Sequence, residues 1–378
     1  MRATFLIAAA ASLLAVAATA APGPGEIVIA QAAPFSGPLA PTGTHIRAGI
    51  QLYLDRVNAA GGVHGARLRL VSKDDGYKSD ETIRLVKELA REAKPVAFAG
   101  IVGTGNTEAL IKDGVLAEAG VPLVGARSGA TSLVKPVNPW IFQVRATYSE
   151  EVDKIIQQLS TIGFKQLAVF YQDDPFGKDG LAGSEAAARK AGIELVAKAP
   201  YEKNTTKVEE AVRIIGAAQP QGVIMVSNTA ASAEFLKQFR AAGHLAQLIS
   251  VSVTDGPQVA KKVGNEVAHG FGIVQVVPDP NSRGVPISRE LQDAYERFKP
   301  QGIELNHTLL EGFLIGKVLT EGLKRAGPNP TARKLRDALE AIRDFDAGGI
   351  FIGYAAGNHA GSRYTDITIL DRQGRVLR

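Results

Sequence analysis

Two short loops rich in glycine and hydroxyl residues are the segments of this chain best suited to hold a ligand. The first reads Gly103-Thr104-Gly105-Asn106-Thr107, and the second reads Arg127-Ser128-Gly129-Ala130-Thr131-Ser132. Each follows an apolar run typical of a β-strand, and the first opens a stretch with helical periodicity. Free backbone N–H groups at the start of a helix, together with hydroxyls, can receive an anion. The loops therefore predict a cradle for a carboxylate, with two ordinary helix caps as the alternative.

The sequence lacks the motifs that would indicate catalysis or a cofactor. The first loop begins like a dinucleotide fingerprint, but Glu108 stands where a third glycine is needed. The chain has no GxSxG elbow, no HExxH pair and no Walker phosphate loop. Asp173 and Asp174 follow a predicted strand and could act as paired carboxylates, although a hydrated loop or a helix cap is favoured. We expect neither a cofactor nor an enzymatic activity.

Potential metal ligands are also poorly arranged. His307 and Glu311 share one predicted helix face without a second His, so a solvated helix surface is favoured over a metal site. Asp74, Asp75 and Asp80 lack the spacing of a calcium loop. The chain contains no Cys, which excludes disulfides, thiolate zinc sites and a cysteine nucleophile. We expect no bound metal.

The elements that position the two loops alternate between short apolar runs and amphipathic helical stretches. This rhythm covers residues 26–145, with a helix expected over 107–119, and it restarts over 149–273. Residues 286–345 have almost purely helical periodicity, and the tail at 350–377 returns to alternating strands. The pattern predicts an α/β protein with two mostly parallel sheets. The helical block needs a sheet to cover, and the first unit is the expected one, so the chain should cross between units more than once.

The N-terminal segment predicts export. Arg2 precedes an apolar run from Phe5 to Val16, and Ala18-Thr19-Ala20 has the small-x-small pattern that signal peptidase cleaves. The run is shorter than the roughly 20 residues that a membrane-spanning helix needs. We therefore expect residues 1–20 to be a signal peptide that is removed before Ala21, and the mature protein to be periplasmic.

The composition is that of a folded protein with an aliphatic core. Hydrophobic residues make up 45% of the 378 residues, but aromatic residues only 6%. This length favours two domains over one. The formal net charge of +5 comes from scattered Lys and Arg. Because nucleic-acid binding calls for a dense basic stripe with interleaved aromatic residues, we expect no nucleic-acid partner.

Five short motifs occur in order over almost the whole mature chain. They are Pro34-Phe35-Ser36-Gly37-Pro38 with Gly43 and Arg47-Ala48-Gly49-Ile50; Asn58-Ala59-Ala60-Gly61-Gly62-Val63 with Gly65; Asp74-Asp75 with Tyr77; Ser128-Gly129-Ala130-Thr131; and Tyr171-Gln172-Asp173-Asp174-Pro175-Phe176-Gly177. Their sequence and order resemble those of leucine/isoleucine/valine-type periplasmic binding proteins.

This resemblance implies the type I periplasmic-binding fold, in which two Rossmann-like lobes with mostly parallel sheets are joined by three crossovers and the ligand lies between the lobes. It divides the chain into a signal peptide (1–20), a first lobe (21–145 and 275–347) and a second lobe (146–274 and 348–378). The implied function is that of a monomeric solute receptor that delivers a small molecule to a membrane ABC permease. A ligand-sensing subunit for a membrane receptor is an alternative, as is a periplasmic enzyme that uses Asp173, Asp174 or Asp255.

The same resemblance implies which residues contact the ligand. They are Thr104, Ala130 and Thr131 with Ser128 beside them for the carboxylate, and Thr42, Phe176 and Asn228 or Thr229 for the other walls. Relatives that bind branched-chain amino acids place an acidic residue where this chain has Val253. A buried ammonium without a partner costs several kcal/mol. Either Asp255 replaces that acid two residues later, or the ligand is an aliphatic or aromatic acid or an amide without an α-amino group.

Overall fold

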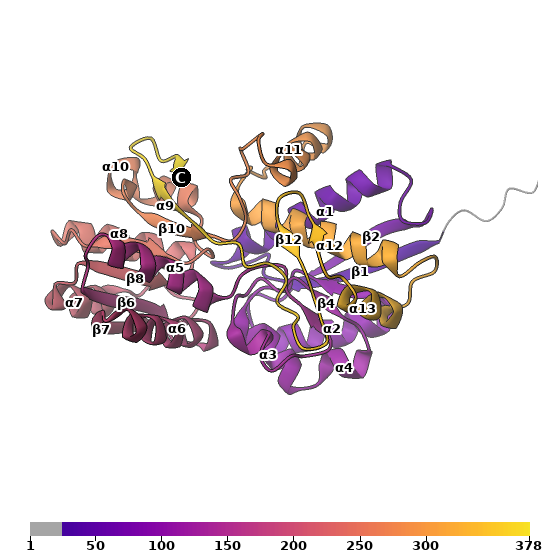
Figure 1. The fold of residues 1–378 in the computed structure, drawn as a ribbon, viewed down its shortest axis with the longest axis horizontal. Coiled ribbons are helices and arrows are strands. Elements are labelled where there is room, and N and C mark those ends of the chain that lie inside the picture. Colours follow the sequence, from indigo (N-terminus) through magenta and orange to yellow (C-terminus); the bar gives the residue numbers. More distant parts are fainter. Residues whose placement is uncertain (1–24) are drawn as a thin grey trace, which may run out of the picture.

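The structure, a computed structural model, describes residues 25–378, so the predicted signal peptide lies outside the described residues. Figure 1 shows two α/β units side by side, each built on its own sheet. The first unit holds the N-terminal elements, whereas the last strands of the chain lie on the second. Two mostly parallel sheets in two lobes were predicted from the alternating pattern, and the fold confirms them.

The first sheet contains five strands in the order β2-β1-β3-β4-β5, all of them parallel. Its strands are β1 (Glu26–Ala33), β2 (Arg67–Asp74), β3 (Ala97–Ala99), β4 (Leu123–Val124) and β5 (Ile141–Phe142). The inner strand β1 is buried on both faces, as expected for a parallel sheet covered by helices. The edge strand β2 instead alternates exposed arginines with the buried Leu68.

The second sheet contains seven strands in the order β14-β13-β10-β9-β8-β6-β7. Its parallel part consists of β6 (Gln166–Gln172), β7 (Glu194–Tyr201), β8 (Gly222–Val226), β9 (Gln247–Ser250) and β10 (Gly272–Gln275). Two antiparallel strands, β13 (Asp366–Leu370) and β14 (Val376–Leu377), extend one edge. The turn between them lies at Asp371–Gly374, and the Asp371 side chain accepts hydrogen bonds from the backbone N–H groups of Gln373 and Arg375.

Helices cover the sheets. In the first unit they are α1 (Ala40–Ala59), α2 (Ser79–Glu92), α3 (Thr104–Lys112), α4 (Val115–Ala119), α11 (Pro286–Phe298), α12 (His307–Arg325) and α13 (Ala332–Glu340). In the second they are α5 (Tyr148–Thr161), α6 (Pro175–Ala191), α7 (Glu209–Ala218), α8 (Thr229–Ala241), α9 (Gly256–Val263) and α10 (Asn265–Ala268). No helix in the described part of the chain is both long enough and apolar enough to span a membrane.

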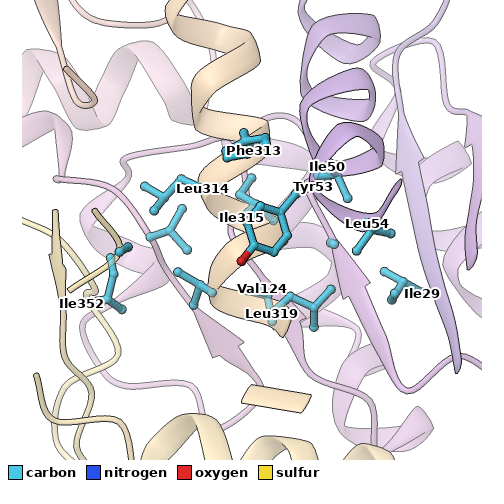
Figure 2. Close-up of a cluster of buried hydrophobic side chains, with 14 of the residues drawn as sticks. Ile29, Ile50, Tyr53, Leu54, Val124, Phe313, Leu314, Ile315, Leu319 and Ile352 are labelled. Atoms are coloured by element: carbon cyan, nitrogen blue, oxygen red, sulfur yellow. The ribbon is translucent and has the colours of Figure 1, made fainter. Parts of the chain in front are cut away.

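The helical block late in the chain covers the first sheet, as predicted. Figure 2 shows Phe313, Leu314, Ile315 and Leu319 of α12 packed among side chains of α1, β1 and β4. The two helices approach closely through glycines: a Cβ added at Gly312 would lie 3.0 Å from the Cα of Ile46, and one added at Gly49 would lie 2.7 Å from the backbone nitrogen of Phe313. The first unit therefore completes its core with residues that follow the entire parallel part of the second sheet.

Two details differ from the sequence expectations. The helix expected over residues 107–119 begins at Thr104 and breaks after Lys112 into α3 and α4, because Gly114 adopts the left-handed conformation that ends helices. The second lobe was expected to resume at residue 348, whereas Ile350, Ile352 and Tyr354 pack in the core of the first unit. The small hairpin of β11 (Phe345–Asp346) and β12 (Phe351–Ile352) thus extends the first unit before the chain crosses for the last time.

Candidate functional site

A small cavity lies between the two units, at the carboxyl ends of both parallel sheets. Such positions are where α/β proteins usually bind ligands. Its lining comes from both units and consists of Leu39, Thr42, Tyr77, Val102, Gly103, Thr104, Arg127 and Tyr148, with Gln172, Phe176, Asn228 and Val253. The cavity volume is about 20 Å³, measured for the centre of a water-sized sphere, which is room for about one water molecule. The two units therefore stand close together in this structure.

The N-terminus of α3 faces this cavity without a side-chain cap. Gly103 occupies the N-cap position and Thr104 is the first helical residue, and both line the cavity. The first N–H groups of a helix have no partner within it, and no side chain caps those of α3. By contrast, Asp174, Asn228 and Asp255 cap the helices that begin at the facing ends of the second sheet. The predicted first anion loop is thus a helix start at this site that has no side-chain cap.

Tyr77 keeps the first loop in this conformation. Its backbone has a φ of 62°, which is rare for a bulky residue, and the Asp75 carboxylate accepts a hydrogen bond from its N–H at 2.9 Å. Gly103 has a φ of 107°, and a Cβ added there would lie 2.5 Å from the Tyr77 ring. A glycine is required at this position because both the conformation and the contact exclude a side chain.

The second loop is occupied by a side chain of the protein. Ser128 lies beside the cavity lining, with its Oγ 2.7 Å from Thr104 Oγ1. The backbone N–H of Thr131 donates to the Asp179 carboxylate of α6 at 2.9 Å, and Ala130 N–H donates to Ser128 Oγ at 3.2 Å. Neither Ala130 nor Thr131 is among the residues that line the cavity. Of the donors predicted to hold a ligand carboxylate here, Thr131 N–H therefore holds a carboxylate from the other unit and Ala130 N–H holds the Ser128 hydroxyl.

Asp179 predicts a pH dependence of stability. Burial raises its pKa from 3.8 to about 6, against the opposing effect of the Thr131 hydrogen bonds, and Glu108 raises it further. A carboxyl group with a higher pKa in the folded chain binds its proton more tightly when folded, so its contribution is complete below about pH 4 and is lost as the pH rises through about 6. Relative to Asp179→Asn, which keeps an acceptor for Thr131, the wild type should lose roughly 2–3 kcal/mol between pH 4 and pH 7. Urea unfolding at a series of pH values measures this, and parallel curves for the two proteins would contradict it.

The wall formed by the second unit is an amide cluster whose hydrogen bonds are already made. Gln172 Oε1 accepts from the Tyr201 hydroxyl at 2.9 Å and from Asn228 Nδ2 at 3.3 Å. Gln172 Nε2 donates to Asp174 at 2.8 Å and to the Tyr77 hydroxyl at 3.4 Å. Asn228 Oδ1 accepts from the first N–H groups of α8. This wall is polar but has few groups left for a ligand.

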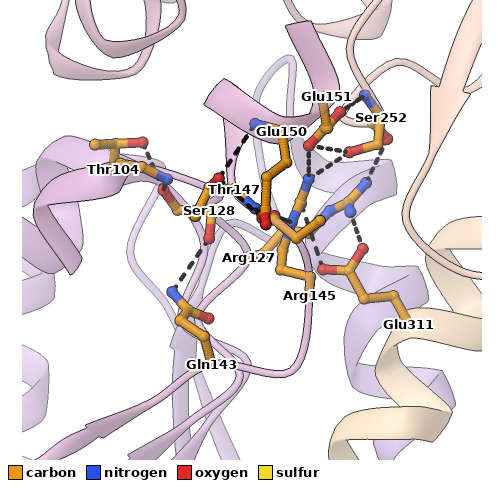
Figure 3. Close-up of polar contacts among 12 residues, drawn as sticks. Thr104, Arg127, Ser128, Gln143, Arg145, Thr147, Glu150, Glu151, Ser252 and Glu311 are labelled. Atoms are coloured by element: carbon orange, nitrogen blue, oxygen red, sulfur yellow. Dashed lines mark hydrogen bonds and ion pairs between the residues drawn. The ribbon is translucent and has the colours of Figure 1, made fainter. Parts of the chain in front are cut away.

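Beneath the cavity, four buried charges join the two units (Figure 3). Arg127 pairs with Glu311 of α12, and Arg145 pairs with Glu151 of α5 and lies 3.5 Å from Glu311. Ser252 of the second unit donates its N–H to Glu151 at 2.7 Å and accepts from Arg127 Nη2 at its carbonyl, at 3.0 Å. Burial raises the pKa of Glu151 and lowers that of Arg127. The loop that carries Val253 is thereby attached to the first unit.

This network corrects the expectation that His307 and Glu311 lie on a solvated helix surface. Glu311 is 1% exposed and His307 is partly buried, and burial lowers the His307 pKa to about 4. The helix face carries charged and polar residues because it meets a buried arginine, not because it meets water.

The other residues predicted to contact the ligand lie partly in the cavity lining and partly outside it. Thr42, Thr104, Phe176 and Asn228 line the cavity, and Thr229 lies in a neighbouring outer pocket that shares Thr42 and Asn228 with it. The Asp255 carboxylate caps α9 by accepting from Gln258 N–H and also accepts from Asn306 Nδ2, and it does not line the cavity.

The two aspartates considered as catalytic carboxylates have structural partners. Asp174 caps α6, as favoured from the sequence, and Asp173 is exposed and pairs with Lys178 at 3.0 Å.

Sequence reasoning missed several lining residues, namely Leu39, Val102, Tyr77, Tyr148, Gln172 and Arg127. Tyr77, Gln172 and Arg127 lie within motifs that were identified from the sequence. Their positions in or near the predicted loops could have indicated that they line the site. Tyr148 lies directly after the Thr147 that caps α5, a position that the capping box of Thr147 and Glu150 could have revealed.

Known proteins resemble this chain over nearly its full length. Residues 26–375 match the family model described as periplasmic binding protein. A substrate-binding periplasmic protein from Ralstonia solanacearum has 37% sequence identity and a TM-score of 0.89, over 93% of this chain and 99% of that one. The Leu/Ile/Val-binding protein homolog 7 of Brucella suis biovar 1 (strain 1330) is 27% identical over 91% of this chain and 88% of its own length.

A third similarity shows the fold. The crystal structure of a branched chain amino acid ABC transporter protein from Thermus thermophilus with bound valine has a TM-score of 0.85 at 20% identity, over 94% of this chain and 95% of that one. Together with the two-lobed architecture and the cavity between its sheets, these similarities show that the chain belongs to the periplasmic binding protein family, with Leu/Ile/Val-binding protein homologues among its relatives.

Proposed function

We propose that this protein is the periplasmic receptor of an ABC importer, which binds a small carboxylate-bearing ligand between its lobes and presents it to the membrane permease. The family consists of substrate-binding receptors rather than enzymes, and its location is the periplasm. We further propose that residues 1–20 direct export and are then removed, and that the mature protein acts as a monomer of two lobes.

The observation that supports this proposal is the cavity itself, since its lining is divided between the two units. Thr42, Thr104 and Arg127 come from the first, whereas Phe176 and Asn228 come from the second. A ligand that contacts both walls stabilises the arrangement in which the walls are close. The size of this effect is set by how much more tightly the ligand binds to that arrangement than to the open one. The permease would thus recognise the ligand-bound protein by the changed position of one lobe relative to the other.

The free donors on one wall support a carboxylate as the group that is recognised. Thr104 offers its hydroxyl, and the uncapped start of α3 offers backbone N–H groups with the positive end of the helix dipole. Arg127 also lines the cavity, and its buried Nε has no hydrogen-bond partner among the described residues. The N–H groups only donate, and the Thr104 hydroxyl, which lies 2.7 Å from Ser128 Oγ, can donate as well as accept. A carboxylate, which only accepts, suits this set of groups.

Scattering and mass spectrometry test this function. The mature protein purified from the periplasm should bind one carboxylate per chain and release it chemically unchanged on denaturation. Small-angle scattering should show a smaller radius of gyration with ligand than without it. A ligand that is turned over, or one that binds tightly outside the cleft without changing the radius, would contradict the proposal.

The Thr104 hydroxyl should make a measurable contribution to affinity. A hydrogen bond to a charged group contributes about 1.5–3 kcal/mol, so Thr104→Ala should weaken carboxylate binding by roughly 10- to 150-fold. Thr104→Ser keeps the hydroxyl and should remain within a few-fold of the wild type. Calorimetry on the three proteins measures the difference, and equal affinities of wild type and Thr104→Ala would show that the carboxylate is held elsewhere.

A further inference from the structure

The charges that line the cavity are unbalanced. Among its lining residues in the described chain, Arg127 is the only charged side chain, and no carboxylate is present. Arg127 is 3% exposed. A cationic group of a ligand would enter this space without an opposite charge, and a buried ammonium without such a partner is strongly unfavourable.

The carboxylates just outside the cavity are already bound to other groups. Their partners are Arg127 for Glu311, Arg145 and Ser252 for Glu151, Thr131 for Asp179, Gln172 and the start of α6 for Asp174, and Gln258 and Asn306 for Asp255. The buried Oδ1 of Asp179 has no hydrogen-bond partner among the described residues, but Asp179 does not line the cavity. At the other four carboxylates, an ammonium group would have to displace one of these partners. Removing a partner from a buried charge leaves that partner unsatisfied, so the exchange offers little gain.

The two amide oxygens on the wall of the second unit are also in use. Gln172 Oε1 accepts two hydrogen bonds, and so does Asn228 Oδ1. An amide oxygen has two lone pairs. These two side chains line the cavity but have no acceptor capacity left for the three donors of an ammonium group.

Aromatic rings can also bind ammonium groups through their faces, and three rings line the cavity. Two of them already have a cation nearby. Lys203 Nζ lies 4.1 Å from the centre of the Tyr77 ring, and the Arg145 guanidinium lies 5.4 Å from the centre of the Tyr148 ring. The third, Phe176, packs against Tyr148 with ring centres 5.0 Å apart. A further cation among these rings would be repelled by the two that are present.

Donors, by contrast, remain available: Arg127 Nε and the uncapped N–H groups of α3. From this accounting we infer that the ligand is a monocarboxylate with an apolar aliphatic or aromatic body and no ammonium group. The inference rests on the proposed function and specifies its ligand class. The cavity as it stands has room for about one water molecule, so the lobes must separate to admit the acid, whose body would then face the apolar side chains of Leu39, Val102 and Val253 and the rings.

Matched pairs of probes test this ligand class by calorimetry on the mature protein. The pairs are valine with 3-methylbutanoate, leucine with 4-methylpentanoate, and phenylalanine with 3-phenylpropanoate. In each pair that binds, the acid should bind at least about 30-fold more tightly than the amino acid. An amino acid that binds as tightly as its deaminated partner, or more tightly, overturns the inference and leaves the proposed receptor function intact.

A variant tests the same idea from the side of the protein. Val253→Asp places a carboxylate in the cavity lining and should shift the ratio of amino-acid to acid affinity by at least about tenfold toward the amino acid. Val253→Asn has nearly the same shape without the charge and should shift this ratio far less. Circular dichroism and the melting temperature show that both variants fold. If the two variants shift the ratio equally, charge does not control selection and the inference fails.

The failure of the proposed function has a different signature. If neither member of any pair binds to the wild type, the carboxylate ligand itself is wrong, and with it the proposed function. If both members of a pair bind with equal affinity, the carboxylate is supported and only the exclusion of the ammonium group is overturned.

Discussion

Replacing Arg145 by Met is expected to destabilise the folded protein by about 3–5 kcal/mol, the range for breaking a buried ion pair. Arg145 is among the largest fully buried side chains of the chain. Its guanidinium lies between Glu151 and Glu311 and donates to the Ser252 hydroxyl. Met has a similar volume but no charge, so both glutamates would remain buried while Arg127 alone is left to balance them.

The double variant Arg145→Met/Glu151→Gln is the control for this prediction. It removes one positive and one negative charge, leaving Arg127 with Glu311, so it should be less destabilised than the sum of the two single variants. Urea unfolding, followed by circular dichroism and by the fluorescence of the single Trp of the chain, measures the stabilities. A loss of less than about 1 kcal/mol for Arg145→Met, or additive losses, would show that water reaches these charges.

Replacing Gly49 by Ala is expected to destabilise the protein by about 3 kcal/mol, at the upper end of the range for overpacked cores. A Cβ at this position would meet the backbone of α12 at Leu309 and Phe313, and no rotamer change can move a backbone away. The α1 and α12 helices would have to separate along the contact that closes the first core.

Gly105→Ala provides the matched control. A Cβ at Gly105 would have its nearest contact at 3.6 Å, with the Pro175 ring, which is an ordinary van der Waals distance. Since Ala has the higher helix propensity, this substitution in α3 should be neutral or slightly stabilising. Thermal and urea unfolding compare the two variants without ligand. A Gly49→Ala protein as stable as Gly105→Ala would mean that α1 and α12 can shift apart without loss.

The features predicted best from the sequence depend on local pattern. The loop at 103–107 was expected between an apolar strand and a helix, and it lies there, although the helix begins at Thr104 and not at residue 107. The late helical block was assigned to the first sheet because a helix with an apolar stripe needs a surface to cover. In each case a few consecutive residues contain the information.

The features that could not be predicted depend on partners distant in sequence. Glu311 was placed on a solvated face because helical spacing identifies a face but not what covers it, and its partner Arg127 is 184 residues away. Thr131 was expected to hold the ligand, since its loop composition suits an anion; that the anion is Asp179 depends on how closely α6 approaches the first unit. Such pairings follow from tertiary packing and leave no mark in local periodicity.

The dependence of the first core on α12 has a consequence for how the chain folds as it is made. The strands of the first sheet are complete once Phe142 has left the ribosome, but the helix that covers one face of that sheet begins only at His307. The parallel part of the second sheet lies entirely between these points, so the first unit cannot complete its core until that part of the second unit has been synthesised. Because native contacts of such long sequence separation form slowly, an emerging chain remains open for much of its synthesis.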